Sequence, residues 1–152
     1  MPANRESLLA GRNQQPLSDN DVRRATNVFL GLEHHPPVRF DPAAKTGFSV
    51  RMEGEDEIAE VVFGVDLYPG QGVTDPNSSL SVEGAAAHEL THWHRWKDKT
   101  ELTDPDLYEI DEALTSLGAA LRYPKLSDQC VRELIADAVQ RLRIFVQRKQ
   151  QA

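Results

Sequence analysis

Two histidines four positions apart, His88 and His92, lie inside the strongest helical pattern of the chain and constrain its fold more than any other feature. In an α-helix such residues lie one turn apart on the same face, so both imidazoles point in one direction. Three alanines directly before His88 let this helix pack closely, and Leu90 and Trp93 give it an apolar side. The pattern therefore predicts a buried helix over about residues 82–97.

The motif His88-Glu89-Leu90-Thr91-His92 is the H-E-x-x-H pattern, in which the two histidines bind Zn²⁺. Glu89 lies about 100° around the helix from His88, beside the metal but badly placed to ligate it. A zinc ion lowers the pKa of a water molecule that it holds, and a glutamate in this position accepts the proton. The alternatives are a chance match and a solvated helix with two surface histidines. Burial of these side chains without a partner would cost several kcal/mol, which favours the metal site with Glu89 as its catalytic residue.

A catalytic zinc needs a third protein ligand, and the next predicted helix offers Glu109, Asp111 and Glu112. At a rise of about 1.5 Å per residue, His92 lies roughly 9 Å and His88 roughly 15 Å from the turn between the two helices. Glu112 lies about 10 Å from that turn, whereas Glu109 lies about 6 Å from it and Asp111 faces about 100° away. The spacing therefore predicts Glu112 as the third ligand.

The segment of residues 82–118 resembles the gluzincin branch of zinc peptidases, the thermolysin-like group. That group has an H-E-x-x-H helix followed by a helix with a ligating glutamate. Residues 110–115, Ile-Asp-Glu-Ala-Leu-Thr, are similar to its Asn-Glu-Ala-Ile-Ser segment. The resemblance implies the zinc ligands His88, His92 and Glu112 and the base Glu89.

The chain departs from that group at Ser116, where those enzymes carry an aspartate that orients a zinc-bound histidine. A serine brings no charge, so we expect this support to be weaker or to come from elsewhere. The large C-terminal domain of the group, with its transition-state histidine, is also absent from this sequence. Two other groups resemble the chain in size: small intracellular zincin-like peptidases that cleave phage-type repressors, and small zincin effectors injected by bacterial pathogens.

These features predict a zinc-dependent hydrolase, an endopeptidase that cleaves a protein or peptide substrate with Glu89 as general base. The alternative is a non-catalytic zincin-like module that binds a metal and a protein partner. Glu89 favours catalysis, since a structural metal site needs no base. In zincins an edge strand above the metal pairs with an extended substrate, and by that resemblance we assign this role to residues 57–67.

The first half of the chain predicts one helix and a β-hairpin. Residues 18–21 have the form of a capping box, and the apolar residues behind them recur at helical spacing until Pro36. Alternating residues in 47–52 and the apolar run 57–67 predict the two strands of the hairpin. A loop follows up to residue 79.

The second half predicts three helices: the metal helix, a helix from Pro105 to Tyr123, and a C-terminal helix that begins at Ser127 or Asp128. The buried face of the last helix is predicted as Val131, Leu134, Ile135, Ala138 and Leu142. The order of elements predicts an α+β, zincin-like fold, with one domain at residues 18–149 behind a loose tail at 1–17.

The composition limits which classes of partner we expect the protein to bind and in which compartment we expect it. The 152 residues carry a net charge of −7 and no long basic run, which argues against nucleic-acid binding. The single cysteine, Cys130, forms no internal disulfide, and neither a signal peptide nor an apolar run of membrane-spanning length is visible. We expect a soluble, cytoplasmic protein without a membrane partner, although secretion without a cleaved signal stays open.

Other polar and aromatic residues have less specific predictions. We expect His94 on the surface, His34 and His35 in a solvated loop, and Cys130 in a structural role. We expect Trp93 and Trp96 to serve in packing. Three residues are candidates to stabilise an oxyanion, although core or surface roles are expected for each: Tyr108, Arg122 and Tyr123.

Overall fold

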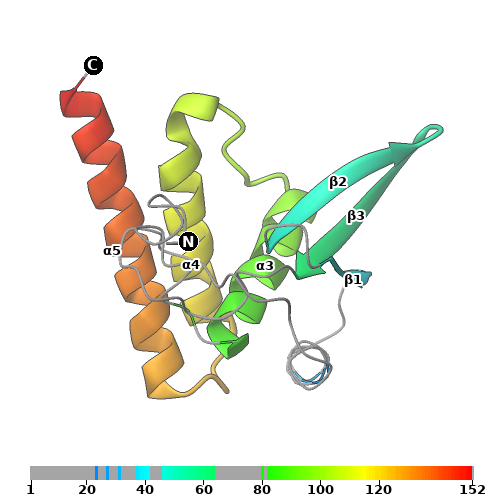
Figure 1. Cartoon of the computed structure of the whole chain (residues 1–152), viewed down its shortest axis with the longest axis horizontal. Coiled ribbons are helices and arrows are strands. Elements are labelled where there is room, and N and C mark those ends of the chain that lie inside the picture. The colour runs from blue at the N-terminus through cyan, green and yellow to red at the C-terminus, as the bar shows by residue number, and fades with distance from the viewer. Residues whose placement is uncertain are drawn as a thin grey trace, which may run out of the picture.

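The structure is a computed structural model that describes residues 37–41, 46–63, 80 and 82–151, together with Arg23, Asn27 and Gly31. In this part of the chain it is an α+β fold with a small three-stranded mixed sheet and three helices (Figure 1). The elements are β1 (Val38–Phe40), β2 (Gly47–Glu53), β3 (Asp56–Phe63), α3 (Val82–Lys97), the 3₁₀ turn η2 (Pro105–Leu107), α4 (Tyr108–Arg122) and α5 (Asp128–Gln150). The prediction of an α+β fold is confirmed at this level.

The sheet has the order β1-β3-β2, with β3 antiparallel to β2 and parallel to β1. The hairpin β2–β3 projects away from the helices in Figure 1, and it turns at Gly54, whose φ is 64°. A glycine with positive φ at the first central position is typical of the two-residue type II′ turn. The buried end of β3 reaches the core through Val61 and Phe63.

This topology corrects one expectation. The strand in residues 57–63, predicted to lie at the edge above the metal, is the central strand of the described sheet. The reason is β1, a short parallel strand that was not predicted from the sequence. It pairs on the far side of β3, where Asp41 N donates to Phe63 O at 3.0 Å and Val61 N to Pro37 O at 2.9 Å. Within the described sheet, the edge strand that contacts α3 is therefore β2.

Helix α3 packs against both the sheet and α4, and α4 and α5 run side by side in opposite directions (Figure 1). The apolar core lies where β3, α3, α4 and the start of α5 meet, and it includes Phe63, Leu90, Ala119 and Leu134. Gly118 marks the close approach of α4 to α3, because a Cβ there would lie 3.1 Å from Thr91 Cγ2.

The predicted starts of the last two helices are confirmed, with one refinement. The Asp104 side chain accepts a hydrogen bond from Asp106 N at 2.9 Å, and Pro105 follows it as the first residue of a 3₁₀ turn, so α4 itself begins at Tyr108. The Ser127 hydroxyl accepts from Cys130 N at 3.2 Å and caps α5. Helix α3 has the bounds expected from the sequence.

The predicted buried face of α5 is partly wrong. Leu134 and Ala138 are buried, but Ile135 and Leu142 are exposed. In their place α5 buries a charged pair, Asp137 and Arg141, together with Cys130. Apolar periodicity cannot reveal a face that carries an ion pair, since such a pair has the polar pattern of a solvated face.

Several predictions fall partly or wholly outside the described residues. Arg23, Asn27 and Gly31 are helical, but the rest of the expected first helix lies outside the described residues, as do the tail at 1–17, His34 and His35. The end of the predicted strand at 64–67 and the loop that follows it up to residue 79 also lie outside them. Among the helices that the structure describes, none is both long and apolar enough to cross a membrane.

Candidate metal centre

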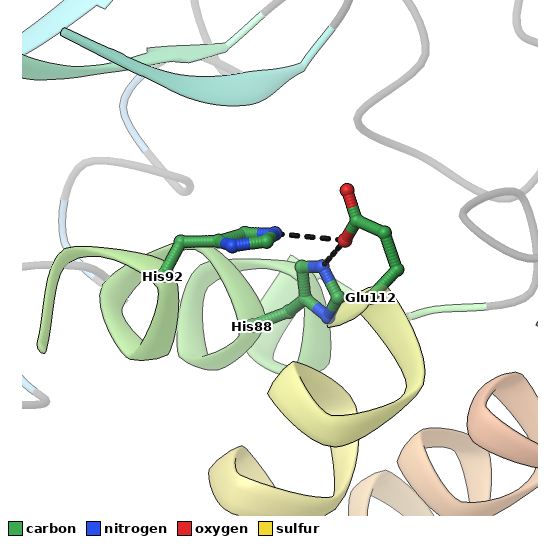
Figure 2. Close-up of side chains that lie close together, drawn as sticks. All are labelled: His88, His92 and Glu112. Carbon is green, nitrogen blue, oxygen red and sulfur yellow. Dashed lines mark hydrogen bonds and ion pairs between the residues drawn. The ribbon is translucent and has the colours of Figure 1, made fainter. Parts of the chain in front are cut away.

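His88, His92 and Glu112 meet at one point between α3 and α4 (Figure 2). Glu112 Oε2 lies 2.9 Å from His88 Nε2 and 2.7 Å from His92 Nε2. All three potential ligand atoms lie within 4.8 Å of one another. The structure thus brings together the three residues that were selected from the sequence as ligands.

Helix geometry explains this convergence. His88 and His92 are one turn apart on α3, with ring centroids 4.8 Å apart and ring planes at 82°. Glu112 lies in the second turn of α4, at the level between the two rings, and Figure 2 shows its carboxylate turned toward both of them.

The competing carboxylates on α4 are engaged elsewhere. Both oxygens of Glu109 accept hydrogen bonds from Arg148 on α5, at 2.8 and 2.9 Å. Asp111 Oδ1 pairs with Arg95 at 2.8 Å and accepts from Leu102 N at 2.8 Å. Asp111, His92 and Glu101 also form a group with metal-ligand spacing, but its aspartate is already neutralised by Arg95.

The centre is buried and strongly polarised. His88 is 1% and His92 8% exposed. Burial alone would raise the pKa of Glu112, but hydrogen bonds from both histidines outweigh it and hold the pKa far below its usual range. Burial likewise opposes protonation of His92, yet hydrogen bonds to Glu101 and Glu112 raise its pKa to about 10. Both shifts reflect the hydrogen bonds that join the carboxylates to the imidazole rings at the point where the three side chains meet.

Glu89 is buried beside these groups without taking part in their hydrogen bonds. It is 5% exposed, and its Oε2 has no hydrogen-bond partner. Burial raises the pKa of this carboxyl group, against the opposing influence of His88 and His92. A buried hydrogen-bond acceptor without a partner costs about 1–3 kcal/mol of stability. The unpartnered oxygen of Glu89 therefore indicates that a further polar group binds beside it and completes the site.

The outer nitrogens of both histidines have partners of their own. His88 Nδ1 lies 2.7 Å from Ser116 Oγ, and the Ser116 hydroxyl donates to Asp137 Oδ2. His92 Nδ1 lies 3.5 Å from Glu101 Oε1 and 3.4 Å from Thr115 Oγ1. Ser116 was singled out in the sequence, but Asp137 and Glu101 were not. Neither stands in a motif, and only the crossing of α5 behind α4 brings Asp137 to this position.

A cleft of about 410 Å³ opens over the centre. One wall is β2 with the residue before it, from Thr46 to Val50, and the Phe48 ring stacks on His92 with centroids 6.3 Å apart. The floor and the other wall are formed by His88, Glu89, His92, Glu101, Tyr108 and Glu112. The edge strand and the three converging side chains thus share one cavity.

The residues considered as oxyanion donors, and His94, lie in different parts of the structure. Tyr108, 59% exposed, lines the cleft, whereas Tyr123 is in the core. The prediction that His94 lies on the surface is wrong, because it is buried and its Nδ1 lies 2.9 Å from Arg122 Nη2 on α4. Arg122 is not among the residues that line the cleft.

The predicted packing roles fit the remaining contacts. Trp93 packs against the core and has Lys97 Nζ 3.7 Å from its ring centroid, and Trp96 meets Phe48. Cys130 is a buried free cysteine.

The fold and this cluster define a class of protein: an α+β domain with a buried His–His–Glu group whose spacing suits a metal ion. No protein-family model, curated protein or solved structure matches the chain.

Proposed function

We propose that this chain is a zinc-dependent hydrolase of the zincin type that acts as an endopeptidase. The observation that carries the proposal is the convergence of His88, His92 and Glu112 in one cleft with Glu89, whose Oε2 has no hydrogen-bond partner. His88, His92 and Glu112 would hold the metal, and Glu89 would be the general base.

The donor set fits zinc. Two imidazole nitrogens and one carboxylate oxygen are the protein ligands of a common type of catalytic zinc site, which keeps a further position open. The cleft gives access to that position, and a cation would satisfy the charge of Glu112. When bound, the zinc ion would act as a Lewis acid that lowers the pKa of water and polarises a carbonyl group.

Glu89 supplies what a structural metal site does not need. Its carboxylate lies next to both histidines without bonding to them. In the proposed reaction Glu89 accepts a proton from the attacking water and then returns it to the nitrogen of the leaving amine.

The strand edge and Tyr108 support a peptide as the substrate. In the described sheet β2 pairs only with β3, so its other edge is open toward an extended chain in the cleft. Partial burial and the nearby Glu112 carboxylate raise the pKa of Tyr108 to about 12, so its phenol remains a hydrogen-bond donor. From the wall of the cleft, this donor would stabilise negative charge on the carbonyl oxygen.

The test is Glu89→Gln, which keeps the size of the side chain and removes its ability to accept a proton. Cleavage of a peptide library and of unfolded proteins should fall by about 10²–10⁴-fold, because general-base catalysis contributes that much. Zinc content should match that of wild type, because Glu89 is not a ligand. Glu83→Gln, on the same helix and outside the cleft lining, is the matched control and should keep full activity.

The alternative, a metal-binding module that holds a protein partner, predicts a different result. Zinc would be present in both wild type and Glu89→Gln, neither would cleave any substrate, and both would have the same effect in the cell. That outcome would overturn the hydrolase assignment.

A further inference from the structure

Asp137 on α5 is a buried carboxylate that lies behind the metal centre. It is 1% exposed, and its Oδ2 accepts a hydrogen bond from the hydroxyl of Ser116 on α4. Ser116 Oγ in turn lies 2.7 Å from His88 Nδ1. Three helices therefore contribute to one hydrogen-bonded chain that ends on a candidate ligand.

The number of available protons determines which group donates and which accepts in this series of hydrogen bonds. A serine hydroxyl has one hydrogen, and in Ser116 that hydrogen points to Asp137, because an ionised carboxylate can only accept. Ser116 Oγ can then meet His88 Nδ1 only as an acceptor, so Nδ1 must carry a proton. The hydrogen bond at Nδ1 turns the other ring nitrogen, Nε2, toward Glu112 and the proposed metal position.

Arg141 supports the same arrangement from the other side of Asp137. Its Nε donates to Asp137 Oδ2 at 2.9 Å, and its Nη1 lies 3.9 Å from Glu112 Oε2. A buried carboxylate is tolerated when a cation and hydrogen bonds compensate it, and Asp137 has both.

A simpler interpretation is that Asp137 and Arg141 form only a structural ion pair between α5 and α4. Ser116 separates the two interpretations. It takes no part in the Asp137–Arg141 ion pair, yet it is the link to His88. A structural pair needs Asp137 but does not need the Ser116 hydroxyl.

We infer that Asp137, acting through Ser116, is the positioning residue that holds the His88 ring by a hydrogen bond from Nδ1 and keeps Nε2 turned toward the metal position. The part of this inference that concerns the metal rests on the proposed function. The part that concerns the proton does not, because it follows from hydrogen bonds within the chain.

The first test is the protonation of His88 in the metal-free protein, read from ¹⁵N chemical shifts of labelled histidine. In wild type we expect a proton on Nδ1. In Ser116→Ala the Nδ1–H loses its acceptor while Nε2 keeps Glu112, so the Nδ1 shift should change and the Nε2 shift should stay close to that of wild type. A bare Nδ1 in wild type would overturn the inference, whether or not the protein hydrolyses anything.

The second test is the affinity for Zn²⁺ alone, measured by competition with a chelator. Loss of an outer hydrogen-bond partner of a ligating histidine typically costs 10–100-fold in metal affinity, and we expect this loss in both Ser116→Ala and Asp137→Asn. Asp128→Asn makes the same chemical change at an exposed carboxylate in the first turn of α5 and should leave the affinity unchanged. Wild-type affinity in Ser116→Ala, with a loss only in Asp137→Asn, would reduce Asp137 to a structural ion pair.

The two tests separate the two proposals. If wild type binds no zinc, the proposed function fails and the protonation of His88 still decides the positioning role. If zinc binds and Glu89→Gln behaves as predicted but Nδ1 is bare, only the positioning role fails.

Discussion

At the scale of single residues, the candidate site depends on which carboxylate is available to share a cation with two histidines. Glu112 faces both rings, whereas Glu109 is bound to Arg148 and Asp111 to Arg95. The three neighbouring acids on α4 thus have different partners, and the position of each acid along the helix determines which partner it meets.

Glu112→Ala and Glu109→Ala test this division. Glu112→Ala removes a proposed ligand, so zinc affinity should fall by more than the 10–100-fold typical of an outer-shell loss. Glu109→Ala removes an ion pair between α4 and α5 and should leave zinc affinity close to that of wild type. The measurement is chelator competition on both variants. The reverse ranking would mean that the second turn of α4 does not face the histidines in solution.

The residues that converge could be selected from the sequence because their positions depend on helical spacing alone. His88 and His92 are four apart, and Glu112 follows from the rise of two antiparallel helices. Asp137 could not be selected in this way. Its contact with Ser116 depends on where α5 crosses α4, and no local pattern encodes that crossing.

At the scale of the elements, the hairpin β2–β3 holds the open strand edge beside the cleft. Its position depends on a tight turn at Gly54 and on the pairing of β3 with strands on both sides. The sequence predicted both hairpin strands and the bounds of α3, where alternation and helical periodicity are clear. It did not predict β1, because three residues after two prolines show no periodic signal.

Gly54→Ala tests the turn. The φ of 64° at Gly54 is unfavourable for a residue with a Cβ by roughly 1–2 kcal/mol, so the free energy of unfolding should decrease by about that amount. Gly47→Ala is the matched control in the same hairpin. An added Cβ there meets nothing within 4 Å and its φ is not positive, so it should cause no loss. Chemical denaturation of the two variants gives the comparison. Equal stability would show that the turn does not hold this conformation in solution.

At the scale of the whole molecule, the candidate centre lies where the helices and the sheet meet. α3 provides two of the converging side chains and Glu89, α4 the third, α5 the charged residues behind them, and β2 the wall above them. The three converging side chains have the spacing of metal ligands and lie in a cleft. The central claim is therefore that the chain holds a metal ion.

Elemental analysis of the protein, purified without chelator, tests this claim most directly. We predict one zinc ion per chain in wild type and none in His88→Ala. His94→Ala is a control on the same helix, because His94 contacts Arg122 outside the site, and this variant should retain the zinc. Wild-type protein that is folded and contains no transition metal, even after incubation with zinc, would contradict the claim.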